Sequence, residues 1–217
     1  FNEAHWLKRV RYTDDTAVNN LEIGGRNLVL NSGFTSTNGW GAITGSILGV
    51  DNGELSFLGS GGSGWRALMS SSNNLVSLKA GSFYTLSYQL MFTDIETIGS
   101  DVFLGFHIIA SPAPDGSSFG LNVRDQIDPD LVGEWQTVKA TVQATHDVDT
   151  AVRLRFGSLP FGEIKIRRVK VEKGNKATDW TPAPEDIQYD YEAEIKKAAD
   201  SISLAVYNKT LDKLNPA

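Results

Sequence analysis

Residues 169–186 read VKVEKGNKATDWTPAPED, and this stretch marks the end of one structural unit and the start of another. Its first valines alternate with polar residues up to Val171, as in a final β-strand. The Gly-Asn pair that follows accepts turn conformations that other residues resist. Pro182 and Pro184 cannot continue a strand ladder or a helix interior. The stretch therefore predicts a β-domain that ends here, sealed by Trp180, and a helix that departs after Pro184.

The residues after Pro184 have a helical period. Glu185 and Asp186 are expected at the helix start, where carboxylates meet the positive end of the helix dipole. An apolar stripe follows at spacings of four, four, three, four and three: Ile187, Tyr191, Ile195, Ala198, Ile202 and Ala205. A helix cannot bury such a stripe alone. We expect a helix over 185–217 that forms a trimeric coiled coil with its copies, with packing on the preceding domain as the alternative.

Length and composition limit the class of protein. At 217 residues the chain suits one sizeable domain and an appendage. A net charge of −6 and a pI of about 5.1 argue against a nucleic acid partner, because a phosphate backbone requires a basic footprint. No run of about 18 apolar residues exists, so no membrane partner is expected. The absence of cysteine fits a protein made in the cytosol, and the missing initiator Met indicates a piece of a longer chain.

Short apolar alternations dominate residues 26–184. The clearest is 83–92, where every second position from the second onward is Tyr, Leu or Phe. Residues 102–109 are apolar on both faces, as in a central strand, and Trp135 at the start of another segment is expected in the core. About eight or nine such segments, separated by turn residues, predict an all-β antiparallel sandwich over 26–184. Residues 1–25 are expected to be an upstream element and a linker.

Two patterns look like sites and are better explained as structure. The glycines at 59, 61 and 64 match a dinucleotide fingerprint as text, but strand-like residues follow where the fingerprint needs a helix. The three histidines share no metal-ligand spacing: His5, His107 and His146. His107 is therefore expected to be a packed strand residue.

Carboxylate side chains raise two further possibilities, a site for a cation and a hydrolase active site. One loop carries three of them: Asp125, Asp128 and Asp130. A solvated acidic turn is the favoured interpretation, and a site for a hard cation is the alternative. No nucleophile motif appears, so we expect no enzyme; a glycan hydrolase would need two carboxylates about 5–10 Å apart.

Aromatic residues indicate a saccharide ligand. Proteins bind sugars by stacking them on exposed rings and by pairing their hydroxyl groups with polar side chains. Trp40 and Trp65 lie beside glycine-rich loops, where a ring can be exposed, although core positions are an equal alternative. Arg66 follows Trp65, and Gln89 and Arg155 lie on strand faces opposite the apolar ones. These five residues are the candidate saccharide-binding residues.

Four segments together resemble a known family. Residues 25–34 (GRNLVLNSGF) and 169–186 look like its two flanks, and residues 83–88 (FYTLSY) and 134–138 (EWQTV) look like its internal strands. The family comprises carbohydrate-binding-module-like jelly rolls in tail and baseplate proteins of phages and prophages of Gram-positive bacteria. The likeness covers residues 26–186, nearly the whole predicted sandwich.

The resemblance implies a jelly-roll β-sandwich in the virion, as a non-catalytic domain of a tail-tip, fibre or baseplate protein that is made in the bacterial cytoplasm. Its partners would be a host cell-wall polysaccharide, recognised during adsorption, and other tail subunits. A structural spacer or oligomerisation domain is the first alternative, and a glycan hydrolase is the second. Glycan contacts vary within the family, so the resemblance assigns no binding residue.

The resemblance also bears on whether the domain binds a structural calcium ion. The related modules of families 4, 9 and 22 often carry a structural calcium between the first strand and the last. The acidic positions that hold it correspond here to Thr35 and to the neighbourhood of Arg167 and Arg168, which offer no carboxylate. We therefore expect no cofactor and no metal, with a structural calcium as the alternative.

Overall fold

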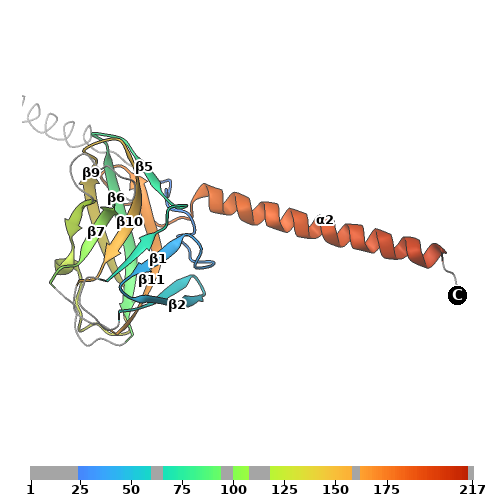
Figure 1. Cartoon of the computed structure of the whole chain (residues 1–217), viewed down its shortest axis with the longest axis horizontal. Coiled ribbons are helices and arrows are strands. Elements are labelled where there is room, and N and C mark those ends of the chain that lie inside the picture. Colours follow the sequence, from blue (N-terminus) through green and yellow to red (C-terminus); the bar gives the residue numbers. More distant parts are fainter. Residues whose placement is uncertain (1–23, 60–65, 94–99, 108–117, 158–161, 215–217) are drawn as a thin grey trace, which may run out of the picture.

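The computed structural model describes residues 24–59, 66–93, 100–107, 118–157 and 162–214. In these ranges two antiparallel sheets form a sandwich, and a long helix extends away from it (Figure 1). The prediction of an antiparallel jelly-roll β-sandwich followed by a C-terminal helix is confirmed.

Each sheet is named here after its central strand. The β10 sheet has the order β1 (Trp40–Ile43), β4 (Ala67–Ser70), β10 (Val148–Arg155), β7 (Phe103–His107) and β8 (Ser118–Asn122), and β5 (Val76–Leu78) also pairs with β10. The β11 sheet has the order β2 (Ser46–Asp51), β3 (Glu54–Leu58), β11 (Glu163–Lys173), β6 (Phe83–Phe92) and β9 (Gln136–Gln143). The chain passes repeatedly between the two sheets, as in a jelly roll.

The core lies between the sheets and follows from the alternation in the sequence. The inward side chains of β6 are all buried: Tyr84, Leu86, Tyr88, Leu90 and Phe92. Tyr84 meets Phe106 of the other sheet edge to face, with ring centroids 6.3 Å apart, and Tyr88 meets Phe156 at 6.4 Å. Burying each large apolar side chain contributes about 1.5–3 kcal/mol, and a one-residue slip would expose the whole row. The alternation therefore fixes the register of β6.

The edge strand β9 is closed by side-chain amides. Gln126, in the short 3-10 helix η1 (Arg124–Gln126), accepts from the backbone N–H of Lys139 and donates to its carbonyl oxygen, both at 2.8 Å. Gln136 makes the same paired contact with the backbone of Asp128, both bonds at 2.7 Å. Asp128 Oδ1 accepts from the backbone N–H of Asp130 at 3.0 Å. The acidic segment of the sequence thus folds as a turn that covers a sheet edge.

Helix α2 (Pro184–Leu214) projects from the sandwich and is not covered by it (Figure 1). Its large apolar side chains with described positions are 44–68% exposed: Ile187, Tyr191, Ile195, Ile202 and Leu204. The alternative in which the sandwich covers the apolar stripe is therefore wrong. Within the described residues, no helix is long and apolar enough to cross a membrane.

Candidate functional site

The structure does not bring the five candidate residues together. Gln89 lies on β6 in the β11 sheet, whereas Arg155 lies on β10 in the other sheet. Arg66 directly precedes β4, and its backbone pairs with residues 156 and 157 beside Arg155. Trp65 lies outside the described residues. The candidates therefore belong to two opposite sides of the sandwich.

Two of the candidates, Trp40 and Arg66, are buried, and for Trp40 the structure shows the core alternative. Trp40 is only 7% exposed, because β1 turns its ring into the core, 5.3 Å from the ring of Phe34. Its indole Nε1 donates to the carbonyl oxygen of Asn31 at 3.1 Å. Arg66 is fully buried. Neither side chain offers a surface on which a sugar could stack.

On the outer face of the β10 sheet, the arginine side chains contact other residues of the chain. Arg155 forms an ion pair with Asp101. Arg153, two residues earlier on β10, lies 5.7 Å from the ring centroid of Phe103, and its Nη1 is 3.2 Å from Nδ1 of His107. Burial lowers the pKa of His107, and the positive charge of Arg153 lowers that pKa further. His107 is thus part of a packed cation cluster on this sheet.

The outer face of the β11 sheet has a different character. Gln89 is half-buried; its amide donates to Oγ1 of Thr137 at 3.3 Å and accepts from Nε of Arg167 at 2.8 Å. The Arg167 guanidinium lies 3.8 Å from the ring centroid of Trp135 and 3.6 Å from a carboxylate oxygen of Glu54. Burial lowers the pKa of Arg167, as does the charge of the neighbouring arginine. Trp135 therefore lies at this surface and is only half-buried, although the sequence favoured the core.

A groove of about 200 Å³ lies next to this row. Its lining combines hydroxyl, amide, cationic, carboxylate and ring groups: Ser87, Tyr88, Gln89, Thr137, Lys139, Arg168, Thr178, Asp179 and Trp180. Thr137, Lys139, Arg168 and Asp179 are exposed, and Trp180 is half-buried. Of the candidate residues that the structure describes, Gln89 is the one that lies in this groove.

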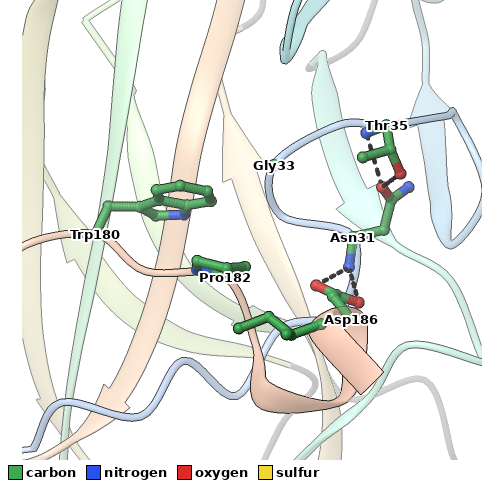
Figure 2. Close-up of a pocket in the computed structure, with 7 residues that line it drawn as sticks. Asn31, Gly33, Thr35, Trp180, Pro182 and Asp186 are labelled. Atoms are coloured by element: carbon green, nitrogen blue, oxygen red, sulfur yellow. Dashed lines mark hydrogen bonds between the residues drawn. The ribbon is translucent and has the colours of Figure 1, made fainter. Parts of the chain in front are cut away.

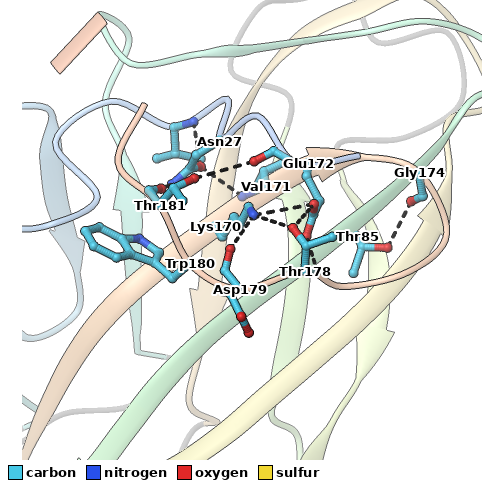
Figure 3. A network of polar contacts seen from close by, with 12 residues as sticks. Asn27, Thr85, Lys170, Val171, Glu172, Gly174, Thr178, Asp179, Trp180 and Thr181 are labelled. Carbon is cyan, nitrogen blue, oxygen red and sulfur yellow. Dashed lines mark hydrogen bonds and ion pairs between the residues drawn. The ribbon is translucent and has the colours of Figure 1, made fainter. Parts of the chain in front are cut away.

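The segment after β11 forms one end of the groove and is held by a buried polar network (Figure 3). Nζ of Lys170 donates to Oγ1 of Thr178 at 2.6 Å and to the carbonyl oxygen of Asp179 at 2.7 Å. Glu172 accepts from the backbone N–H and from the hydroxyl of Thr178, both at 2.7 Å. Lys170 and Glu172 are each only 1% exposed and lie 3.5 Å apart. This latch, defined as Lys170, Glu172 and Thr178, positions Asp179 and Trp180.

A single asparagine joins the first segment of the sandwich to the last strand. Nδ2 of Asn27 lies 2.8 Å from Oγ of Ser32 and 3.0 Å from the carbonyl oxygens of both Val169 and Thr181. Its Oδ1 accepts from the backbone N–H of Val171 at 3.2 Å. Because Asn27 is fully buried, these bonds satisfy a carboxamide that would otherwise be costly to bury.

On the other side of Trp180, a junction pocket of about 340 Å³ separates the sandwich from the helix start (Figure 2). Its lining residues are Asn31, Gly33, Thr35, Trp180, Pro182, Asp186 and Ile187. The Asp186 carboxylate accepts from the backbone N–H of Asn31 at 2.9 and 3.0 Å. A Cβ on Gly33 would lie 3.3 Å from the Trp180 ring, so the loop packs closely on the indole. Trp180 thus contacts the sandwich as a seal, as predicted, and also borders two cavities.

The positions that the sequence resemblance relates to a calcium site, Thr35 and the neighbourhood of Arg167 and Arg168, carry no carboxylate. The backbone N–H and the hydroxyl of Thr35 both donate to Oδ1 of Asn31 at 3.0 Å, and Arg167 is engaged with Gln89 and Trp135. In the described part of the chain, no group of three or more His, Cys, Asp or Glu side chains is placed to hold a metal ion. The uncharged amide of Asn27 connects the segment before β1 to β11.

The fold and the groove define a class of protein: a jelly-roll β-sandwich domain with a groove on the outer face of one sheet. The chain is similar to the tripod from the baseplate of bacteriophage Tuc2009, with a TM-score of 0.52 and 19% identity, covering 76% of this chain and 61% of that one. It is also similar to a family 4 carbohydrate-binding module, with a TM-score of 0.45 and 17% identity over 66% of this chain and 97% of the module.

A third similar structure is the N-terminal cellulose-binding domain of β-1,4-glucanase C from Cellulomonas fimi, with a TM-score of 0.40 and 18% identity over 64% of this chain and 91% of that domain. No protein-family model and no curated protein sequence matches the chain. The structural neighbours thus include a phage baseplate domain and carbohydrate-binding modules, as the sequence resemblance implied. The chain spans 61% of the length of the tripod chain, and this likeness concerns the fold.

Proposed function

We propose that this chain is a non-catalytic saccharide-binding domain of a phage or prophage tail protein, and that the β11-sheet groove receives a host cell-wall saccharide during adsorption. The observation that carries the proposal is the groove lining. Ser87, Gln89 and Thr137 supply hydroxyl and amide groups, and Trp180 supplies a ring at one end. This combination of a few fixed polar groups and an aromatic surface suits a sugar ring.

The same groove argues against the glycan hydrolase alternative. Glycoside hydrolysis generally needs two carboxylates on either side of the scissile bond, about 5–10 Å apart. Among the described residues that line the groove, Asp179 is the one carboxylate. Nearby on the same sheet face, Glu54 is occupied by Lys165 at 3.1 Å and Arg167 at 3.6 Å. The domain is therefore proposed to bind without catalysis, in the tail tip or baseplate of a virion and beside other tail subunits.

The proposal is tested by titrating the purified chain with cell-wall polysaccharides from a panel of Gram-positive bacteria in a calorimeter. Gln89→Ala and Thr137→Val remove groove contacts and should each weaken binding by roughly 3- to 10-fold. Thr141→Val is the matched control: this residue lies on the same face of β9 but does not line the groove. Absence of binding to every polysaccharide, or equal affinities for all variants, would contradict the proposal.

A second candidate function, an oligomerising spacer in the tail, is favoured by helix α2. Its exposed apolar stripe begins at Ile187 and continues through Tyr191, Ile195 and Ile202, which are 64–68% exposed. A long helix that the sandwich does not cover gains its stability by burying such a stripe against another helix. The proposed partner is the same helix of two further copies, giving a homotrimer.

Sedimentation velocity of the chain with and without residues 187–217 tests this second function. The longer form should sediment as a trimer and the truncated form as a monomer. Ile195→Asp with Ile202→Asp should abolish the trimer, whereas Ala193→Asp with Ser203→Asp adds the same charge to other helix faces and should leave it intact. Identical monomeric sedimentation of both forms would exclude the coiled coil.

A further inference from the structure

The outer face of the β11 sheet carries both cationic and acidic side chains. Its cations are Lys139, Lys165, Arg167 and Arg168, in a chain whose net charge is −6. Asp51, Glu54 and Glu163 are its acidic residues, and the Glu54 carboxylate contacts Lys165 and Arg167. Lys139 and Arg168 are exposed and form no ion pair with another described residue, and both line the groove. Asp179, also in the groove, is the opposing charge.

The strand register places these two cations on either side of β6. Lys139 of β9 lies opposite Ser87, and Arg167 of β11 lies opposite Gln89. Arg168 follows in the irregularity of β11 that comes before Lys170, which again lies opposite Ser87. Two strand spacings separate the backbones of β9 and β11, about 10 Å in all. The groove therefore has a cation on each flank and hydroxyl and amide groups on the strand between them.

The backbone at Arg168 supports a functional role for its side chain. Its φ angle is 55°, in the left-handed region that arginine adopts only at a cost and that glycine or asparagine adopts easily. A bulge inside a central strand changes the direction of a side chain and is common beside binding sites. Here the strained residue is an exposed arginine at the groove. Backbone strain of this kind clusters at functional sites, including ligand clamps.

We propose that the saccharide bound in this groove is anionic, and that Lys139 and Arg168 hold its negatively charged substituent, a phosphodiester or a carboxylate. This inference rests on the proposed saccharide-binding function and specifies the chemistry of the ligand. Charge-assisted hydrogen bonds from ammonium and guanidinium groups are the strong contacts for such substituents. Ser87 and Gln89 then contact the sugar hydroxyl groups, and Asp179 accepts from a further hydroxyl at the far end.

Three polymers test the inference by calorimetric titration of the whole chain: poly(glycerol phosphate), polygalacturonate and the neutral glucan laminarin. The first two separate phosphate from carboxylate as the recognised group. Arg168→Asn, which suits the left-handed backbone, and Lys139→Gln should each weaken binding to the preferred anionic polymer by roughly tenfold or more. Lys196→Gln on α2 makes the same change in net charge away from the groove and should change affinity less than twofold. Raising the salt concentration should weaken anionic binding further.

The outcomes separate this inference from the function on which it rests. Binding of either anionic polymer that depends on Lys139 and Arg168 supports both. Binding of laminarin or of a neutral cell-wall glycan that Gln89→Ala weakens and Arg168→Asn leaves unchanged overturns the anionic ligand and retains the saccharide-binding function. Failure to bind any of the three polymers or any cell-wall polysaccharide overturns both.

Discussion

The outer faces of the two sheets both carry arginines, but they use them differently. On the β10 sheet, Arg153 and Arg155 contact Phe103 and Asp101, so that their charges serve the packing of the sandwich. On the β11 sheet, Arg168 is exposed at a groove. The guanidinium of Arg167 lies over the ring of Trp135 on the same sheet. An outward position on a strand is therefore insufficient to assign a binding role. What distinguishes the β11 sheet is the cavity beside its cations.

The latch explains why the groove exists on the β11 sheet. Lys170 and Glu172 would be outward residues of an ordinary strand, but the segment after β11 covers them and binds both through Thr178. That segment then presents Asp179 and Trp180 as one wall of the groove. The buried ion pair is thus a structural part of the proposed binding face.

The largest effect is expected from breaking this latch. Lys170→Met leaves the Glu172 carboxylate buried without its cation, and removal of one partner from a buried pair costs about 3–5 kcal/mol. Lys165→Met is the matched control on the same strand, because its pair with Glu54 is partly exposed and contributes about 0–1 kcal/mol. Urea denaturation monitored by tryptophan fluorescence measures both changes. Equal small losses would show that the covering segment does not depend on the latch.

An intermediate loss of stability is expected from a substitution on the outer face of the β10 sheet. Gly120 of β8 lies beneath Phe103, and a Cβ there would be 2.6 Å from that ring and 2.5 Å from the carbonyl oxygen of Leu104. Gly120→Ala should therefore destabilise the fold by about 1–3 kcal/mol through overpacking. Gly41→Ala in β1 of the same sheet, whose Cβ would meet nothing nearer than 4.0 Å, should be neutral or slightly stabilising. Thermal denaturation that ranks the two variants in the opposite order would contradict this account of the packed face.

The fold could be predicted from the sequence because it depends on local patterns. The alternation of 83–92 gives one buried face, and the turn and prolines of 169–186 end the sandwich where the structure ends it. The sequence also carries a signal for the bulge of β11. The inward apolar residues of β11 are at even positions first, Ile164 and Ile166, and at odd positions afterwards, Val169 and Val171. Two arginines lie between the two pairs. This break in the period of two marks where an extra residue enters the strand.

The candidate site could be predicted only in part, because it depends on contacts between distant segments. Gln89 was identified from its outward position, but its partners Thr137 and Arg167 come from two other strands. The burial of Trp40 depends on the loop that supplies Asn31 and Phe34. Trp180 was expected to seal the domain, and no local pattern indicates that its ring also borders a groove. Cross-strand register and loop packing thus decide which side chains share a surface.

The smallest effect concerns pH and the cation cluster of the β10 sheet. Burial, and secondarily the charge of Arg153, lower the pKa of His107 below its ordinary value of 6.5. The unfolded chain therefore binds a proton at this position more readily than the folded one, so stability should fall as the pH decreases through about 6.5. The loss should level off once the pH lies below the folded-state pKa of His107. His107→Asn should flatten this part of the profile, measured by urea denaturation between pH 7.5 and 5. Arg153→Gln should reduce the slope without removing it, because burial is the larger cause. If neither substitution changed the slope of stability against pH, His107 would not be the group that titrates in this range. The two sheet faces would then differ only in the groove of the β11 sheet.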